Sequence, residues 1–205
     1  ACLANNHMMD YGASGLKETL VNLDAASIRH AGAGRDAAEA GAGALLALPH
    51  LTVGLIAATD NMPEFAAGPG RAGTNHMRFR RDSEGLEWVS RSVAALRKAG
   101  AGLIVLSLHW GPNMRLRPNR KFRDFARGAI ERGVDVIHGH SAHVFHAIER
   151  HRQGVIFGRA RIGSLIALTV FADVGMGAGQ HSGLQADSAG HAQRVCADRL
   201  VKAYA

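Results

Sequence analysis

Hydrophobic residues in the first part of the chain follow the spacing of helices. Leu16, Leu20 and Leu23 recur at intervals of three and four residues, so they share one helical face. We expect a helix here, with Ser14 as its N-terminal cap. An Ala- and Gly-rich stretch follows, and a second helix is expected to begin at about Asp36.

Further along, apolar runs without helical periodicity alternate with amphipathic helices. Residues 51–58 and 103–108 are continuous apolar runs, which predict buried strands. Helices are expected over 83–100 and 122–133, each ending at a glycine, and a strand over 134–140 follows. This alternation predicts an α/β domain, in which functional side chains gather at the C-terminal ends of the strands.

The remaining segments are less regular. Residues 59–82 are expected to form a long irregular segment, and residues 146–157 a hairpin. From residue 158 on, the chain becomes rich in Gly, Ala, Ser and Gln. We therefore divide it into a domain over residues 1–157 and a divergent, poorly packed tail over residues 158–205. Within that tail, a buried strand is expected at 164–172 and a last helix at 192–204.

Charge and cysteine content narrow the class of protein. A net charge of +7 and a pI of about 10.2 favour anionic partners. Cys2 and Cys196 are too few for a disulfide scaffold, and a bridge between them is not indicated. No run approaches the roughly 18 apolar residues of a membrane-spanning helix, and the first residues do not resemble a signal peptide. The sequence leaves the compartment open between the cytoplasm and the cell envelope.

Histidines are concentrated in one region of the chain. Half of the 12 histidines lie between His109 and His151. His140 and His143 follow one predicted strand and His109 follows its neighbour, so their rings can converge at one edge of the sheet. Because imidazole is a common ligand of zinc, manganese and iron, this pattern predicts a metal site formed by His109, His140 and His143.

The other histidines of this region are interpreted as supporting or surface residues. His138 is expected to point away from His140, and His146 and His151 are assigned no ligand role. A rival interpretation is the HxHxxH spacing of metallo-β-lactamase-type hydrolases. Those sites need an aspartate just before the last histidine, where this chain has Ala142, so the rival is the weaker interpretation.

The segment "NNH" near the start of the chain carries the remaining candidate chemistry. The amide oxygen of Asn6 can bind a hard metal ion, and His7 can hydrogen-bond or protonate a phosphoryl oxygen. Three residues alone are weak evidence for a phosphoesterase site. Their position ahead of "HWG" and "GHSAH", in that order, strengthens the evidence.

With these motifs in order, the chain resembles the capsule-synthesis CapA family of poly-gamma-glutamate biosynthesis. The resemblance rests on "NNHMMDYG", "GLKETLVNLDAASIRHAGAG", "LSLHWGPN" and "GVDVIHGHSAHVFHAIERHRQGVIF", and it spans residues 1–157. It implies the calcineurin-like metallophosphoesterase fold, a four-layer sandwich with a dinuclear site of manganese, iron or zinc. Carried over residue by residue, the metal ligands would be Asn6, His109, His140 and His143, and His7 would contact the scissile phosphate.

The chain also departs from the family pattern. The N-terminal "GD" strand and the acidic or Asn-bearing loop after it are expected to lie upstream of residue 1. Asn113 stands where relatives commonly have a glutamate, and "GRARIGSLIALTV" replaces the usual continuation after residue 157. We therefore expect an incomplete metallophosphoesterase-like sandwich, β-sheets flanked by helices, in a truncated or frame-shifted chain.

Cationic and acidic residues near the motifs suggest an anionic substrate. Arg115 and Arg117 directly follow the "HWG" motif and could steer a phosphate ester or a polyglutamate chain, although a solvated helix face explains them equally well. Asp60, in the irregular segment, is a further candidate for substrate binding. Nucleic acid is not favoured, because aromatic residues are not interleaved with the cations.

The resemblance, together with these residues, implies a capsule or poly-gamma-glutamate biosynthesis protein that hydrolyses a phosphate ester or related acidic substrate with divalent metal ions. Two alternatives remain open. The chain could be a non-catalytic factor that binds or exports an acidic polymer, or it could be an inactive fragment.

Overall fold

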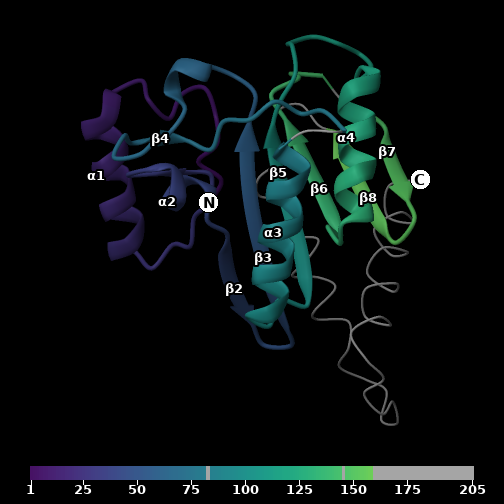
Figure 1. The fold of residues 1–205 in the computed structure, drawn as a ribbon, viewed down its shortest axis with the longest axis horizontal. Coiled ribbons are helices and arrows are strands. Elements are labelled where there is room, and N and C mark those ends of the chain that lie inside the picture. Colours follow the sequence, from purple (N-terminus) through teal and green to yellow (C-terminus); the bar gives the residue numbers. More distant parts are fainter. Residues whose placement is uncertain (82–83, 145, 159–205) are drawn as a thin grey trace.

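The computed structural model describes residues 1–81, 84–144 and 146–158, which build a six-stranded sheet with helices on both sides (Figure 1). The strands, in their order across the sheet, are β2 (Ala44–Leu48), β3 (Leu51–Thr59), β5 (Leu103–His109), β6 (Val136–His140), β8 (Gly154–Gly158) and β7 (Ile148–His151). The four central strands run parallel, while β2 and β7 pair antiparallel at the two edges. The predicted α/β class is confirmed.

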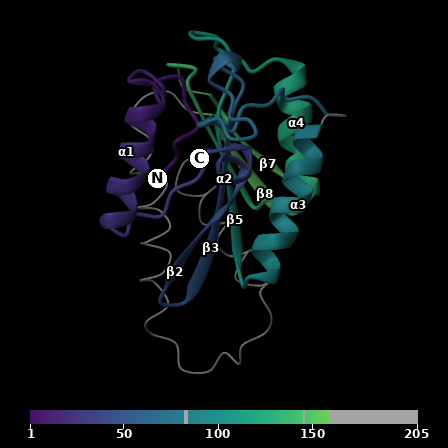
Figure 2. The same cartoon turned by 60° about the vertical axis from the view of Figure 1, so that its left-hand side comes forward.

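Two helices cover one face of this sheet. They are α3 (Glu84–Lys98) and α4 (Arg120–Glu131), and the core between them and the strands includes Ile56, Leu106 and Ile137, each 0% exposed. Figure 2 shows α1 (Gly12–Ala25) on the opposite side of the sheet from these two helices. There α1 packs through Leu16 and Leu20 beside a two-stranded sheet of β1 (Ala33–Gly34) and β4 (Gly73–Thr74).

The predicted start of one helix agrees with the structure, and the cap predicted for another does not. The Asp36 side chain caps α2 (Ala37–Gly41) at the expected position, by accepting from the backbone N–H of Glu39. Ser14 is not the cap of α1, because the chain already turns from Met9 onward and Tyr11 occupies the cap position. The Ser14 hydroxyl instead donates to the Tyr11 carbonyl from inside the helix.

The Ala- and Gly-rich stretch forms less helix than its composition suggests. The helix expected from Asp36 ends at Gly41, and β2 follows it as a strand that the sequence interpretation missed. The backbone approaches α3 closely at Gly43, where a Cβ atom would lie 2.9 Å from Leu96 Cδ1. Pairing with β3 and this close contact outweigh the helical propensity of alanine.

The irregular segment and the hairpin match their predictions. Residues 59–82 contain only β4 and a 3-10 turn, η1 (Pro63–Phe65), within the described part. β7 and β8 form the expected antiparallel hairpin, and Arg152 adopts a positive φ of 51° in its turn. The strand expected at 164–172 and the helix expected at 192–204 lie outside the described residues. Within the described ranges, no helix is long and apolar enough to cross a membrane.

A buried ion pair holds α3 to the start of β5 and β6. Asp135 accepts from an Arg97 guanidinium nitrogen at 2.6 Å and from the Ile104 backbone N–H at 2.7 Å. The Asp135 side chain is 8% exposed, and burial raises its pKa. Its removal would leave both donors without their partner.

We expect Asp135→Ala to lower the free energy of unfolding by about 3 kcal/mol, because it breaks a buried pair and leaves the Ile104 N–H unsatisfied. Urea denaturation measures this loss. The matched control is Arg91→Ala, whose pairing with Glu87 at 4.0 Å is exposed. It should change stability by at most about 0.5 kcal/mol. Equal effects of the two variants would contradict the assigned role of Asp135.

Candidate functional site

Three polar residues stand side by side at the C-terminal ends of neighbouring parallel strands. Thr59 of β3 is in register with His109 of β5, and His109 is in register with His140 of β6. The imidazole rings of His109 and His140 have centroids 5.1 Å apart. The two strand-end histidines of the sequence interpretation therefore do meet, at the edge where α/β sheets carry their functional groups.

His109 is oriented through one of its ring nitrogens. Its Nδ1 lies 2.9 Å from the Asn61 side-chain nitrogen and 3.3 Å from Thr59 Oγ1. Thr59 also donates its hydroxyl proton to the His109 carbonyl at 2.8 Å, which ties backbone and ring together. With Nδ1 engaged, Nε2 is the ring nitrogen without a partner among the described residues.

His140 belongs to a second group of polar side chains on the same face of the sheet. Ser107 Oγ lies 3.3 Å from both His140 Nε2 and His138 Nδ1. Because a hydroxyl carries one proton, Ser107 donates to one ring and accepts from the other, which couples the tautomers of the two histidines. Cys2 Sγ lies 3.8 Å from His140 Nε2, and burial raises the pKa of this thiol.

The expected orientation of His138 is wrong. Its ring stacks on that of His140 with centroids 5.3 Å apart, so both side chains lie on one face. Residues i and i+2 of a strand share a face, because side chains alternate with a period of two. His138 therefore borders the site as the stacking neighbour of His140.

Burial keeps both strand-end histidines neutral. It lowers the pKa of His109 to about 4, with further contributions from His7 and His143. It also lowers the pKa of His140 to about 3, with contributions from His138 and His109. A neutral imidazole is the form that binds a metal ion.

We expect the free energy of unfolding of metal-free protein to fall as the pH drops from about 7 to about 5. In this window the unfolded chain protonates both histidines near the ordinary value of 6.5, whereas the folded protein keeps them neutral. The stabilisation from the two neutral histidines is thus complete above pH 6.5 and is lost as the pH falls toward their folded pKa values of about 4 and about 3. Urea denaturation in the presence of a chelator should show a loss of about 2 kcal/mol per pH unit, about 1 kcal/mol from each histidine. The double variant His109→Gln/His140→Gln should flatten this slope, and an unchanged slope would contradict the assignment.

The N-terminal segment adds the candidate catalytic group. His7 Nδ1 donates to the Asp10 carboxylate at 2.9 Å, and the Asn6 side-chain nitrogen lies 3.2 Å from His7 Nε2. The Asn6 amide oxygen has no partner among the described residues, and His7 is close enough to His109 to lower its pKa. His7 thus lies near His109, while the predicted metal-ligand role of Asn6 and the catalytic role of His7 stay predictions.

Loops link the strand ends to one another. The Asp60 carboxylate accepts from the Gly111 backbone N–H at 3.0 Å, and burial raises the pKa of this carboxyl. The Trp110 N–H donates to the His140 carbonyl. His143, with a positive φ of 55°, is exposed and acts electrostatically on His109. Asp60 therefore serves the loop after β5, which leaves it less free for substrate than the sequence suggests.

The donor set suits a divalent metal ion in its chemistry but is incomplete in number. His109 and His140 offer neutral nitrogens at a separation compatible with a shared ion, since zinc lies about 2.0–2.1 Å from each imidazole nitrogen. In residues 1–81, 84–144 and 146–158, however, no group of three or more His, Cys, Asp or Glu side chains is arranged to hold a metal. The described residues thus provide two close imidazoles with neighbouring donors, and further ligands are needed for a closed site.

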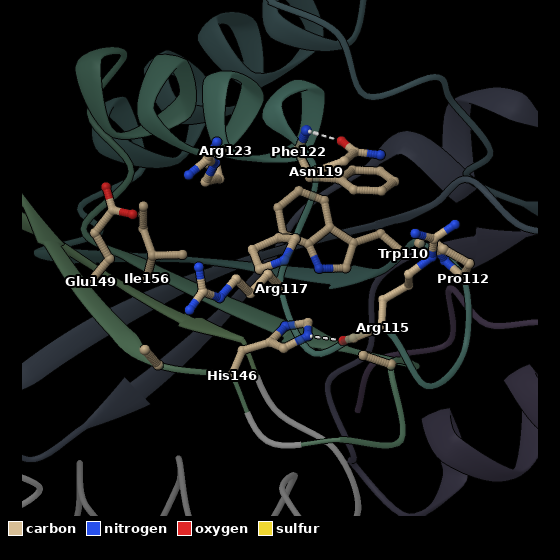
Figure 3. A pocket seen from close by; sticks show the side chains of 15 residues that line it. Trp110, Pro112, Arg115, Arg117, Asn119, Phe122, Arg123, His146, Glu149 and Ile156 are labelled. Atoms are coloured by element: carbon tan, nitrogen blue, oxygen red, sulfur yellow. Dashed lines mark hydrogen bonds between the residues drawn. The ribbon is translucent and has the colours of Figure 1, made fainter.

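A cavity of about 190 Å³ lies at the start of α4, next to the loops after β5 and β6, and both predicted substrate-binding arginines line it (Figure 3). Its wall includes Trp110, Phe122 and Arg123, together with Arg115 and Arg117. The Trp110 and Phe122 rings have centroids 5.1 Å apart. Trp110 packs on Phe79 and Phe125 in the core under α4, so the cavity lies on the α4 side of the sheet, and neither His109 nor His140 lines it.

Comparison with known proteins identifies the family. The family model described as "Bacterial capsule synthesis protein PGA_cap" matches residues 1–158. The chain belongs to this family. A "Probable polyglutamine synthesis accessory protein" of Mycobacterium tuberculosis is 34% identical to this PGA_cap member over 162 residues, 76% of the chain and 42% of the relative. The "Capsule biosynthesis protein CapA" of Bacillus anthracis is 30% identical over 162 residues, 76% of the chain and 37% of the relative.

A solved structure shows a weaker similarity. The crystal structure named "Putative 5'-Nucleotidase from Staphylococcus aureus in complex with alpha-ketoglutarate" matches this PGA_cap member with a TM-score of 0.49 and 17% identity. The match covers 76% of the chain and 31% of the solved one. Similarity at this level carries no information about activity. The PGA_cap member spans about two fifths of the length of the curated relatives it matches.

Several residues of the site were not found from the sequence. Thr59, Asn61 and Ser107 touch the histidines but have no distinctive motif. Thr59 and Ser107 could have been found by aligning the predicted strands in register, because each stands opposite a histidine of the next strand. Cys2 gave no signal, because its contact with His140 joins residues 138 positions apart.

Proposed function

We propose that this PGA_cap member provides the histidine half of a metallophosphoesterase-type centre that acts in capsule or poly-gamma-glutamate synthesis. The substrate would be a phosphate ester or a related acidic molecule, and the reaction a metal-dependent hydrolysis. The observation that carries the proposal is the pair of neutral imidazoles of the buried His109 and the partly buried His140, with ring centroids 5.1 Å apart at the ends of adjacent parallel strands. Family membership supports the biological setting.

Within this proposal, His109 and His140 hold the metal through Nε2 and Nδ1, the nitrogens that their hydrogen bonds leave open. Asn6 and His143 are the additional candidate ligands. A bound divalent ion would supply Lewis-acid activation of water and would neutralise charge on the phosphoryl oxygens. The curated relatives extend well beyond the matched part.

His7 is proposed as the group that holds a proton near the leaving oxygen. Its Nδ1–H donates to the Asp10 carboxylate, which fixes the orientation of the ring. Asp10 is thus a positioning residue for His7. Asn61 and Thr59 have the same kind of role for His109.

Turnover of bis(p-nitrophenyl) phosphate in the presence of Mn²⁺ or Zn²⁺ tests the proposal. We expect metal-dependent release of nitrophenol that is lost in His109→Ala and retained in His151→Ala, a histidine that faces Glu131 instead. Absence of turnover in a chain that still binds metal would favour the non-catalytic alternative, a factor that binds an acidic polymer. Equal activity in both variants would contradict the assigned site.

A further inference from the structure

The loop that joins β5 to α4, residues 110–119, exposes two large apolar side chains. This β5–α4 loop projects beyond the ends of the strands in both views (Figure 1, Figure 2). Met114 is 67% exposed and Leu116 is 77% exposed, and neither belongs to a core cluster of the described residues. Apolar residues scattered singly over a surface are ordinary, but two of them on one projecting loop indicate a contact site.

The same loop is strongly cationic. Arg115 and Arg117 alternate with the two apolar residues, and Lys121 follows in the first turn of α4. Between residues 112 and 123 the chain contains no aspartate or glutamate. None of these three cations forms an ion pair with a residue that the structure describes. The loop therefore combines an apolar tip with positive charge that is not neutralised nearby.

The backbone of the β5–α4 loop is held in place. Met114 adopts a positive φ of 60°, which residues with a side chain rarely do. Its N–H donates to the Ala142 carbonyl at 2.8 Å, and His146 Nε2 donates to the Arg115 carbonyl at 2.7 Å. These two bonds fix the loop to the segment after β6. The apolar tip is thus presented before any partner arrives, which lowers the entropic cost of binding.

The form of the tip favours a lipid surface over the other anionic partners. A stable protein interface buries about 800 Å² on each partner, far more than two side chains on a projecting loop supply. A soluble acidic polymer would pair with the cations but would leave Met114 and Leu116 in water. An anionic bilayer accommodates both features, because its headgroups attract cations and its interface takes up apolar side chains.

We propose that the β5–α4 loop docks onto the surface of an anionic lipid bilayer. Met114 and Leu116 would enter the boundary between headgroups and acyl chains, and the cations of the loop would lie against lipid phosphates. Docking through this loop turns the C-terminal edge of the sheet, with its strand-end histidines, toward the lipid. The inference goes beyond the proposed function, since docking requires neither a metal ion nor hydrolysis.

Flotation of the full chain with lipid vesicles measures docking. We expect binding to vesicles of an equal mixture of phosphatidylglycerol and phosphatidylcholine to be at least about tenfold stronger than binding to phosphatidylcholine alone, because several cations act together. Raising the salt concentration should weaken it. No binding to the anionic vesicles, or equal binding to the neutral ones, would overturn the proposal.

Removing the apolar tip separates docking from general charge attraction. Met114→Ser/Leu116→Ser keeps every charge and should weaken binding to the anionic vesicles at least about tenfold, because less apolar surface enters the lipid. The matched control is Val21→Ser/Ile28→Ser, which changes two other apolar residues that are 57% and 46% exposed. It should leave binding within about twofold. Equal effects of the two double variants would contradict the proposal.

Removing the cations of the loop tests the position of the charge. Arg115→Gln/Arg117→Gln should weaken binding about tenfold or more, since both cations would lie at the lipid surface. The control Arg91→Gln/Lys98→Gln removes the same net charge from α3, where both residues are exposed. It should weaken binding less than about threefold. A loss of the same size in the control would mean that net charge alone drives binding.

A fluorescent label reports whether the tip enters the lipid. In the full chain carrying Cys2→Ser/Cys196→Ser, nitrobenzoxadiazole attached to Leu116→Cys should shift its emission to the blue on addition of the anionic vesicles. The same label on Leu48→Cys should not shift, because Leu48 is 44% exposed but pairs with the start of β3, at the opposite edge of the sheet. An equal shift with soluble polyglutamate would assign the loop to acidic polymers and overturn the proposal.

Discussion

Replacing His140 with alanine is expected to lower the affinity of the chain for Mn²⁺ or Zn²⁺ at least about a hundredfold. Loss of a residue that merely supports a ligand already costs 10- to 100-fold, so loss of a ligand should cost no less. The reason lies in the geometry, because the His140 ring is 5.1 Å from that of His109 and is neutral at physiological pH. Isothermal titration with either metal measures the change.

The matched control for this variant is His146→Ala. His146 lies in the loop after the same strand but contacts the Arg115 carbonyl instead of the strand-end rings. Its removal should change the metal affinity by less than about threefold. A similar loss in the two variants would mean that the histidine-rich segment binds metal without a defined site.

Phe125→Ala is expected to lower the free energy of unfolding by about 4 kcal/mol, because it removes a fully buried aromatic ring and leaves a cavity. Phe125 is 0% exposed, with ring centroids 4.9 Å from Phe79 and 6.4 Å from Trp110. Urea denaturation measures the stability, and Trp110 fluorescence in a Trp88→Phe background, where Trp110 is the remaining tryptophan, reports on the packing around Phe125.

Two further variants test this reasoning. Phe125→Leu keeps most of the buried volume and should cost less than half as much. Leu116→Ala removes a side chain that is 77% exposed and should be nearly neutral. If Phe125→Ala costs less than about 1 kcal/mol, the core under α4 is not packed as described.

The proximity of His109 and His140 was predictable from the sequence, because the local apolar pattern identifies their strands and the α/β topology makes these strands parallel neighbours. Apolar runs ending at His109 and His140 identify the strands, and parallel strands bring their C-terminal ends to one edge. The helices α3 and α4 were predictable in the same way, from apolar faces that end at Gly100 and Gly133.

Other features depend on contacts that no local pattern encodes. β2 has an alanine- and leucine-rich sequence that suits a helix, and only its pairing with β3 makes it a strand. The contact between Cys2 and His140 joins residues 138 positions apart. The loops after β5 and β6 are joined by the hydrogen bond from His146 Nε2 to the Arg115 carbonyl, between residues 31 positions apart. The wrong orientation predicted for His138 has a different cause. Side chains alternate with a period of two along a strand, so the sequence alone already places His138 on the same face as His140.

The most direct test of the central claim is anomalous X-ray diffraction from crystals of the chain soaked in Mn²⁺ or Zn²⁺. The account predicts an anomalous peak about 2.0–2.3 Å from a ring nitrogen of both His109 and His140, at the C-terminal ends of β5 and β6. A peak located only elsewhere, or full occupancy of the same peak in His140→Ala, would contradict it.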